Sequence, residues 1–453
     1  MPVASSPKTK KKQKGTTAWP VIVSKDLAEE AGRISIEVAD RFLEGDNLAD
    51  NIRVLPSQST DKIPVGLDGP GLLQGFTGLS VLYSQLRRCQ PDEDWNSPAN
   101  HFLKIAAEYV VPESRVSNDL SICSGVSGMA YAVMQTYRGK STFKKLLAQT
   151  NQILLDKIQE RIDKFAVPGG LAAFDYDALY GVAGIGRYLL VGSTIDERLQ
   201  KPLHAILKVL IDRSKFEDGF PALYTAERDL TEMEKDLYNC RVVNCGLAHG
   251  VPSVLALLAI AFKEGYQIEG LAGAVEFWAN WLQGVTVNDQ WGVNWPTVVP
   301  MDGRELQPSR AAWCYGTPGL ANALWLAGDA LDDSQSRDAA IKGMEAVYRR
   351  PVSVQHILSP CFCHGTSGLL QVTLRFAART GLPVFAQASE DLVRRIIKVY
   401  DPANIYWGFC DVLPEGQKTD LPTILNGASG VILPLLAAAF PAEPIWDQTL
   451  LLS

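Results

Sequence analysis

A short glycine-containing segment recurs seven times along this chain of 453 residues, and each copy opens an apolar stretch. The segment has the form X-Gly-x-x-Gly, and only the fourth copy changes it, with Ser253 in place of the second glycine. The copies occupy residues 74–78, 124–128, 180–184, 249–253, 315–319, 364–368 and 426–430. By subtraction along the numbering, their first glycines are 50, 56, 69, 66, 49 and 62 residues apart. Self-similarity at this period is typical of architectures built from one repeated supersecondary unit.

Two kinds of predicted helix alternate with these copies. The stretches that follow the copies, such as residues 79–83 and 369–374, are apolar nearly all round, as a helix buried on every side must be. The segments between copies are one-sided: in residues 143–162, apolar side chains recur at helical spacing among Lys, Gln, Asp and Glu. Strand signals are sparse, and residues 291–300 are the best candidate for a short extended hairpin.

This alternation predicts an all-α fold, an (α/α) toroid of seven inner and seven outer helices with a minor β insertion. A solenoid needs polar caps on its terminal repeats, but the first and last copies here resemble the middle ones. Closing the repeats into a ring removes the need for caps. We expect residues 19–453 to form this single toroid domain, and residues 1–18, with their run of lysines, to be a disordered basic tail.

Charge and hydropathy exclude two classes of partner. The formal net charge is −7 and the pI is near 5.4, which gives no electrostatic reason to expect nucleic acid. The longest apolar runs, near residues 251–262 and 431–440, are too short for a bilayer, so no membrane insertion is expected. The eight cysteines lack the dense spacing of a disulfide scaffold and no export signal is visible, which favours a cytoplasmic protein with thiols or metal ligands.

The residue before each first glycine predicts where a site would lie. In a toroid these residues meet where the inner helices converge, and every one of them carries a polar group: Gln74, Ser124, Tyr180, His249, Tyr315, His364 and Asn426. One end of the ring is therefore expected to hold a polar site.

The fifth and sixth copies carry the residue types of a metal site. Cys314 precedes Tyr315, and Cys363 precedes His364, on repeats that are neighbours in a ring. Two sulfurs and one imidazole nitrogen suit Zn²⁺, and three protein ligands leave a fourth position open, as in catalytic zinc sites. Cys361 lies two residues before Cys363, but the repeat register favours Cys363. We expect one zinc ion per chain, held by Cys314, Cys363 and His364.

At these residues the chain resembles the lanthionine synthetase C-like family, the cyclases of lanthipeptide biosynthesis and their relatives. The matching segments are Gly-Leu-Ala-His-Gly at 246–250, Trp-Cys-Tyr-Gly-Thr-Pro-Gly at 313–319, Cys-His-Gly-Thr-Ser-Gly at 363–368 and Asn-Gly-Ala-Ser-Gly at 426–430. The resemblance runs from about Gly69 to Leu436. Trp-Cys-Tyr-Gly followed by Cys-His-Gly is a specific combination, and the family's toroid agrees with the repeat count.

The resemblance implies roles for individual residues. It implies zinc bound by the three residues already named, and catalytic residues at His249, Asp177, Arg310 and Tyr315. Asp175 is a near neighbour of Asp177, so the third repeat offers two carboxylates for one role. Arg310 would stabilise charge on an amide oxygen, and His249 would supply a proton.

The implied activity is a zinc-dependent lanthionine synthetase that adds peptide cysteine thiols across dehydroalanine or dehydrobutyrine. Its expected partners are a dehydrated precursor peptide and, in a biosynthetic complex at the membrane periphery, a dehydratase and an exporter. Two alternatives remain open. One is a related zinc enzyme that adds glutathione or another thiol to an electrophile, and the other is a non-catalytic scaffold that binds peptides.

Overall fold

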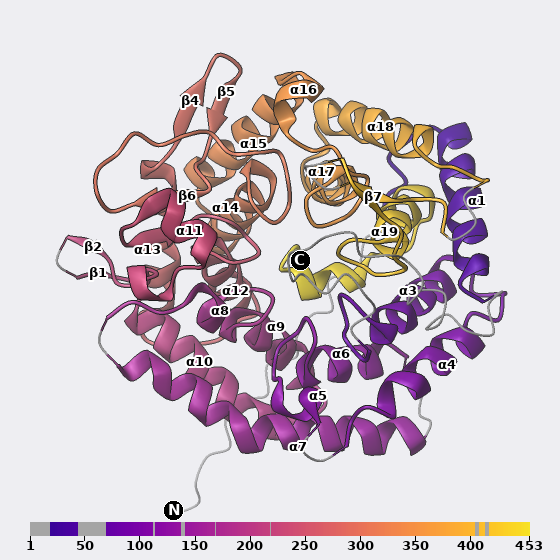
Figure 1. The fold of residues 1–453 in the computed structure, drawn as a ribbon, viewed down its shortest axis with the longest axis horizontal. Helices are drawn as coiled ribbons and strands as arrows, with labels where there is room; N and C mark the ends of the chain where they lie inside the picture. The colour runs from indigo at the N-terminus through magenta and orange to yellow at the C-terminus, as the bar shows by residue number, and fades with distance from the viewer. Residues whose placement is uncertain are drawn as a thin grey trace, which may run out of the picture.

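The computed structural model describes residues 19–43, 69–111, 114–136, 141–167, 169–217, 219–403, 407–412 and 416–453. Most of these residues are helical, and the helices form two concentric rings (Figure 1). The predicted basic tail at residues 1–18 lies outside the described residues. In the described part of the chain, no helix has the length and apolar character that a membrane span requires.

The inner ring consists of the apolar helices predicted after each glycine copy. Seven such helices are present among the described residues: α3 (Phe76–Cys89), α6 (Val126–Thr136), α9 (Val182–Gly192), α12 (Val251–Lys263), α14 (Thr317–Leu331), α17 (Thr366–Thr380) and α19 (Ala428–Ala439). Each one contacts the next, and α19 contacts α3, so the ring is closed. The helices are buried nearly all round, as their composition predicts.

The outer ring covers the inner one with amphipathic helices. Six of them follow an inner helix in sequence and pack on it: α4 (Asn96–Ala107), α7 (Ser141–Asp163), α10 (Gln200–Asp212), α13 (Leu271–Gly284), α15 (Ser334–Arg349) and α18 (Pro383–Lys398). The seventh is the first helix of the chain, α1 (Lys25–Arg41), which packs on α19 (Figure 1). The two ends of the chain therefore complete the last helix pair, and the (α/α) toroid of seven inner and seven outer helices is confirmed.

A circle of backbone hydrogen bonds joins the turns that precede the inner helices. In each bond the amide N–H of one turn donates to a carbonyl oxygen of the next, at N···O distances of 2.9–3.2 Å. The bonds run from Leu73 to Cys123, Cys123 to Leu179, Ala178 to Ala248, Ala248 to Cys314, Cys314 to Cys363, Cys363 to Leu425, and Leu425 back to Leu73. They place the polar residue of each copy beside those of its neighbours, at one end of the ring.

At the second glycine of a copy, which the fourth copy replaces by Ser253, the chain passes close to its own backbone. At Gly184 a Cβ atom would lie 2.1 Å from the carbonyl oxygen of Ala178, because the chain doubles back over the helix start. At Gly319 the corresponding carbonyl belongs to Trp313, at 2.2 Å. Both obstacles are backbone atoms, so a side chain there would displace the turn itself.

Gly184→Ala is therefore expected to lower the free energy of unfolding by about 1–3 kcal/mol, the usual range for overpacking. Urea unfolding followed by circular dichroism measures this change. The matched control is Gly273→Ala in the outer helix α13, where a Cβ meets no atom within 4 Å. Since alanine favours helix more than glycine, the control should be unchanged or slightly more stable. Equal stability of the two variants would contradict the packing argument.

Short strands and short helices fill the connections. The strand pairs are antiparallel: β1 (Phe216–Glu217) with β2 (Phe220–Pro221), β3 (Val242–Asn244) with β6 (Val298–Pro300), β4 (Val287–Asp289) with β5 (Gly292–Asn294), and β7 (Asp411–Val412) with β8 (Lys418–Thr419). The short helices are α5 (Arg115–Asn118), α8 (Ala173–Tyr176), α11 (Glu232–Tyr238) and α16 (Val352–Gln355). Short 3₁₀ turns occupy Lys164–Ala166, Glu197–Leu199, Glu227–Asp229 and Ile445–Leu450. The predicted hairpin within residues 291–300 is extended, but its two strands pair with other segments.

The C-terminal segment, residues 445–453, lies inside the ring (Figure 1). It is bound to several inner helices: the Tyr131 hydroxyl on α6 donates to the carbonyl of Ile445, and Asn322 on α14 donates to that of Leu451. Asp447 is fully buried and forms an ion pair with Arg375 on α17, at 2.8 Å. The segment therefore ties together helices from different parts of the ring.

Candidate active site

His249 and Asp177 form a close pair at the polar end of the ring. The distance from His249 Nδ1 to Asp177 Oδ2 is 2.6 Å, and the aspartate is completely buried. Its other oxygen, Oδ1, accepts the backbone N–H groups of Leu179, Tyr180 and Gly181 at 3.0, 2.6 and 2.7 Å. An ionised carboxylate only accepts hydrogen bonds, so Nδ1 of His249 carries a hydrogen and Nε2 is left for chemistry.

The structure separates Asp177 from its neighbour Asp175. The Asp175 carboxylate forms an ion pair with Lys164 at 2.6 Å, while Asp177 faces His249. Of the two carboxylates in this repeat, Asp177 is therefore the one placed to orient the imidazole.

Three aromatic side chains hold the His249 ring. Tyr180 stacks against it with ring centroids 6.3 Å apart and planes 6° apart, and Phe174 meets it edge-on at 5.4 Å. Tyr315 approaches from the next turn, at 5.9 Å. Burial raises the pKa of Tyr315, so its hydroxyl stays protonated at neutral pH. The imidazole is thus fixed by one carboxylate and an aromatic cage, which favours a defined proton-transfer geometry.

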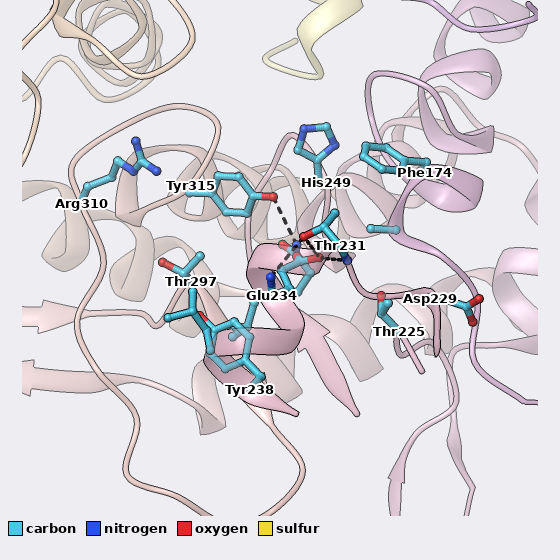
Figure 2. A pocket seen from close by; sticks show the side chains of 14 residues that line it. Phe174, Thr225, Asp229, Thr231, Glu234, Tyr238, His249, Thr297, Arg310 and Tyr315 are labelled. Atoms are coloured by element: carbon cyan, nitrogen blue, oxygen red, sulfur yellow. Dashed lines mark hydrogen bonds between the residues drawn. The ribbon is translucent and has the colours of Figure 1, made fainter. Parts of the chain in front are cut away.

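A pocket of about 380 Å³ opens beside His249. In Figure 2, Arg310 and Tyr315 lie on one side of His249 and Phe174 lies on the other. The far wall comes from the connection between α10 and α12, which includes Glu234, Leu237 and Tyr238 of helix α11. The residues that line the whole pocket are Ala173, Phe174, Thr225, Asp229, Thr231, Glu234, Leu237, Tyr238, Asn244, His249, Thr297, Val298, Arg310 and Tyr315. The glycine repeat does not extend into this connection, so the repeat carried no signal for this wall.

Cys314 and Cys363 lie side by side on neighbouring turns. The backbone N–H of Cys314 donates to the carbonyl of Cys363 at 3.2 Å, and the two thiols are hydrogen-bonded to each other. The hydrogen bond from Cys363, opposed by burial and aided by Arg310 and His364, lowers the pKa of Cys314 to about 6. The same hydrogen bond, together with burial, raises the pKa of Cys363. Two adjacent sulfurs, of which Cys314 is buried and Cys363 is half-buried, suit a soft divalent cation such as Zn²⁺.

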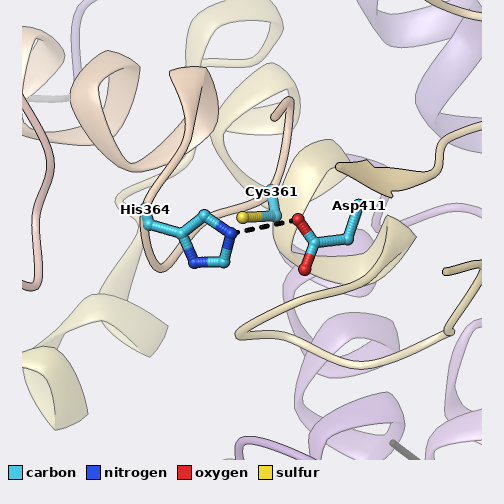
Figure 3. Close-up of side chains that lie close together, drawn as sticks. All are labelled: Cys361, His364 and Asp411. Atoms are coloured by element: carbon cyan, nitrogen blue, oxygen red, sulfur yellow. Dashed lines mark hydrogen bonds and ion pairs between the residues drawn. The ribbon is translucent and has the colours of Figure 1, made fainter. Parts of the chain in front are cut away.

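His364 lies next to this thiol pair but points its Nε2 atom away, toward Asp411. The Nε2···Oδ1 distance is 3.1 Å (Figure 3). Among the described residues, the donors that gather within 4.8 Å of one another are those of Cys361, His364 and Asp411. Burial alone would lower the pKa of His364, but hydrogen bonds to Asp411 and Cys361 raise it to about 10.

The predicted ligands Cys314, Cys363 and His364 thus lie on adjacent turns, and the imidazole of His364 contacts Asp411. Sequence reasoning did not find Asp411, which lies between the sixth and seventh copies in a segment without a repeat signal. Asn426, the polar residue of the seventh copy, donates to Asp411 Oδ2 at 3.0 Å. Among the polar residues of the turns, Tyr180 and Tyr315 therefore lie around His249, and Asn426 is linked to His364 through Asp411.

Comparisons with known proteins agree with this fold. The sequence profile described as lanthionine synthetase C-like protein matches residues 67–451. The chain is 26% identical over 392 residues to the nisin biosynthesis protein NisC of Lactococcus lactis subsp. lactis, covering 84% of this chain and 88% of that protein. A solved structure titled nisin cyclase superposes with a TM-score of 0.72 at 22% identity, covering 95% of this chain and 98% of that one, so the two share the fold. This protein belongs to the lanthionine synthetase C-like family.

Proposed function

We propose that this protein is a zinc-dependent lanthipeptide cyclase that joins cysteine thiols of a peptide to dehydroalanine or dehydrobutyrine residues of the same peptide. One observation carries the proposal: His249, paired with the buried Asp177, lines a pocket on the turn beside the two thiols of Cys314 and Cys363. The relatives named for nisin biosynthesis and nisin cyclisation support the same reaction class.

Cys314, Cys363 and His364 are the residues we propose to hold one zinc ion per chain. The sulfur pair and the adjacent imidazole are a donor set that suits zinc, and three protein ligands leave a position for a substrate thiol. Bound zinc would lower the pKa of that thiol and keep it as a thiolate near neutral pH. A free cysteine thiol has a pKa near 8.5, so only a few per cent is ionised at pH 7 without such help.

The remaining residues serve the addition itself. A bond forms between sulfur and the β-carbon, the carbon–carbon π bond breaks, and negative charge develops on the amide oxygen next to the α-carbon. Arg310 lines the pocket and is the proposed donor to that oxygen. His249 would deliver the proton that the α-carbon then needs, through Nε2, with Asp177 stabilising the charged imidazolium. Tyr315 packs against His249 and would assist in placing the substrate.

The pocket also suits a peptide substrate. Phe174 and Leu237 line it, and these large apolar side chains are 46% and 58% exposed. Exposed apolar side chains beside polar groups are typical of peptide recognition. The proposed partners are a dehydrated precursor peptide and, in one biosynthetic complex, a dehydratase and an exporter. We place this work in the cytoplasm, at the membrane only through that complex, and assign it to residues 19–453 as a single domain.

Zinc content and cyclisation test this proposal together. Purified protein is expected to contain about one zinc per chain, and Cys314→Ala and Cys363→Ala are each expected to lose it, since removing one of three ligands leaves too few for tight binding. Cys89→Ala, at the opposite end of helix α3, is the matched control and should keep its zinc. The zinc content of each purified protein is measured by atomic emission spectrometry.

Cyclisation of a dehydrated precursor peptide is then followed by mass spectrometry after alkylation of the remaining thiols. We expect the reaction to stop in both zinc-free variants. Zinc absent from freshly purified wild-type protein, or unaffected by either change, would overturn the proposal. Turnover with glutathione but not with the peptide would instead support a thiol transferase.

A further inference from the structure

The Asp411 carboxylate is built into the structure beside a proposed zinc ligand. It is 3% exposed, and it accepts hydrogen bonds from three side chains on different segments. Ser359 Oγ donates to Oδ1 at 2.6 Å, His364 Nε2 lies 3.1 Å from the same oxygen, and Asn426 donates to Oδ2 at 3.0 Å. A buried carboxylate is costly unless it is paired, so these contacts define one position for it.

Ser359 fixes this arrangement from the backbone side. Its hydroxyl oxygen accepts the N–H of Cys361 at 3.0 Å and that of Val412 at 3.3 Å. It therefore joins the loop before His364 to the strand β7 that carries Asp411. Neither the loop nor the strand can shift without breaking these bonds, so the position of Asp411 relative to His364 is set in advance.

The contact determines which imidazole nitrogen remains available. With Nε2 directed at Asp411, the other nitrogen, Nδ1, points away from the carboxylate (Figure 3). Histidines that bind metals nearly always donate their second ring N–H to a carboxylate, carbonyl or water, which fixes the tautomer and ring orientation and makes the ligating nitrogen more basic.

We propose that Asp411 is a positioning residue, which accepts the Nε2–H of His364 so that Nδ1 serves as the metal ligand beside Cys314 and Cys363. This inference rests on the proposed zinc site. It adds a residue that does not touch the metal but orients one of its ligands. Asn426 and Ser359 hold the carboxylate in turn.

The competing arrangement uses Asp411 and Cys361 as direct ligands together with His364. Their donor atoms are close enough, within 4.8 Å of one another. However, His364 would then bind the metal through the nitrogen that now faces Asp411, so the hydrogen bond between Nε2 and Asp411 would be lost. Binding beside Cys314 and Cys363 would keep the contact with Asp411, and we favour it for that reason, although the donor atoms of these two cysteines and His364 do not all lie within 4.8 Å of one another in the described part of the chain and would have to draw together.

Metal affinity and a cobalt spectrum separate the two arrangements without an activity assay. Asp411→Asn keeps the shape of the side chain but removes its charge, and we expect it to weaken zinc affinity by about 10–100-fold in competition with a chromophoric chelator. With Co²⁺ in place of zinc, this variant should keep the intensity of the thiolate-to-metal band, because both sulfurs remain, while its d–d bands shift. Cys361→Ser should match the wild type in affinity and spectrum. Cys314→Ser should lose a large part of the thiolate band.

Each result decides the assignment. Unchanged zinc affinity and an unchanged cobalt spectrum in Asp411→Asn would overturn the positioning role while leaving the proposed function intact. Loss of the thiolate band in Cys361→Ser, but not in Cys314→Ser, would place the metal in the competing arrangement. A wild-type protein that binds neither metal would overturn both this inference and the proposed function. Thermal melting of the metal-free variants shows whether each is folded, and Asn426→Ala, which removes one support of the carboxylate, gives a second and milder test of the same contact.

Discussion

Replacing His249 by alanine is expected to slow peptide cyclisation by about 10²–10⁴-fold, the usual contribution of a positioned general acid or base. The imidazole lines the pocket, Asp177 holds its Nδ1 atom, and its Nε2 atom is left for chemistry. Without it, the α-carbon would have to take its proton from water. Zinc content should not change, because His249 lies on a different turn from the proposed ligands.

The measurement is the rate of thiol loss from a dehydrated precursor peptide, read by alkylation and mass spectrometry. His204→Ala is the matched control, since His204 is an exposed histidine on the outer helix α10. Asp177→Asn should also slow the reaction, because the amide no longer stabilises an imidazolium and can select the wrong tautomer. Full activity of His249→Ala would remove His249 from the mechanism.

The same variant distinguishes an enzyme from a scaffold. A protein that only binds peptides should show no difference in its function between His249→Ala and wild type. An enzyme should keep much of its affinity for the peptide and lose turnover. Peptide binding, measured by fluorescence polarisation alongside the rate, therefore tests the non-catalytic alternative directly.

The toroid could be predicted from the sequence because its physical cause is local and repeated. A turn that doubles back under a buried helix needs glycine at positions such as Gly184 and Gly319, where any side chain would meet backbone. Seven turns in register, six of them with this second glycine, leave few alternatives to a ring. The pairing of α1 with α19 was not predictable in this way, because it joins segments about 390 residues apart and depends on where the ring closes.

The site residues that lie in the repeated turns could be predicted from the repeat, whereas those in the irregular connections could not. The neighbouring positions of Cys314 and Cys363 follow from the order of the repeats, and the hydrogen-bonded turns confirm that these positions are adjacent. Asp177 came only from the resemblance, because 72 residues separate it from His249. Asp411 and the pocket wall at α11 lie in irregular connections, where local patterns do not determine which side chains meet.

The strand pairing of residues 291–300 shows the same limit. The composition of this segment correctly indicated extended structure, but β6 pairs with β3 and β5 pairs with β4. The partner β3 lies before the inner helix α12, so its pairing with β6 spans a whole repeat. Pairing over such distances is set by how the repeats pack and not by the strand residues themselves.

Asp447→Ala is expected to lower the free energy of unfolding by about 3–5 kcal/mol, the usual cost of removing one partner from a buried ion pair. Asp447 accepts two hydrogen bonds from Arg375, one from Gln371 and one from Ser453, and has no exposed surface. Its loss would leave the Arg375 guanidinium buried without this carboxylate. Burial and the charge of Arg375 lower the pKa of the nearby Arg379 to about 9, so two guanidinium groups lie close together in this region.

The control for this change is Glu443→Ala, which removes the other carboxylate that contacts Arg375. Glu443 is half exposed, so solvent screens its ion pair, and we expect a loss of no more than about 1 kcal/mol. Urea unfolding of both variants measures the difference. A double variant, Arg375→Met with Asp447→Ala, should recover much of the stability, because the cost comes from a charge left unpaired and not from the pair itself. If Asp447→Ala were no less stable than Glu443→Ala, the C-terminal segment would not be what ties the inner helices together, and the ring would depend on its turns and helix packing alone.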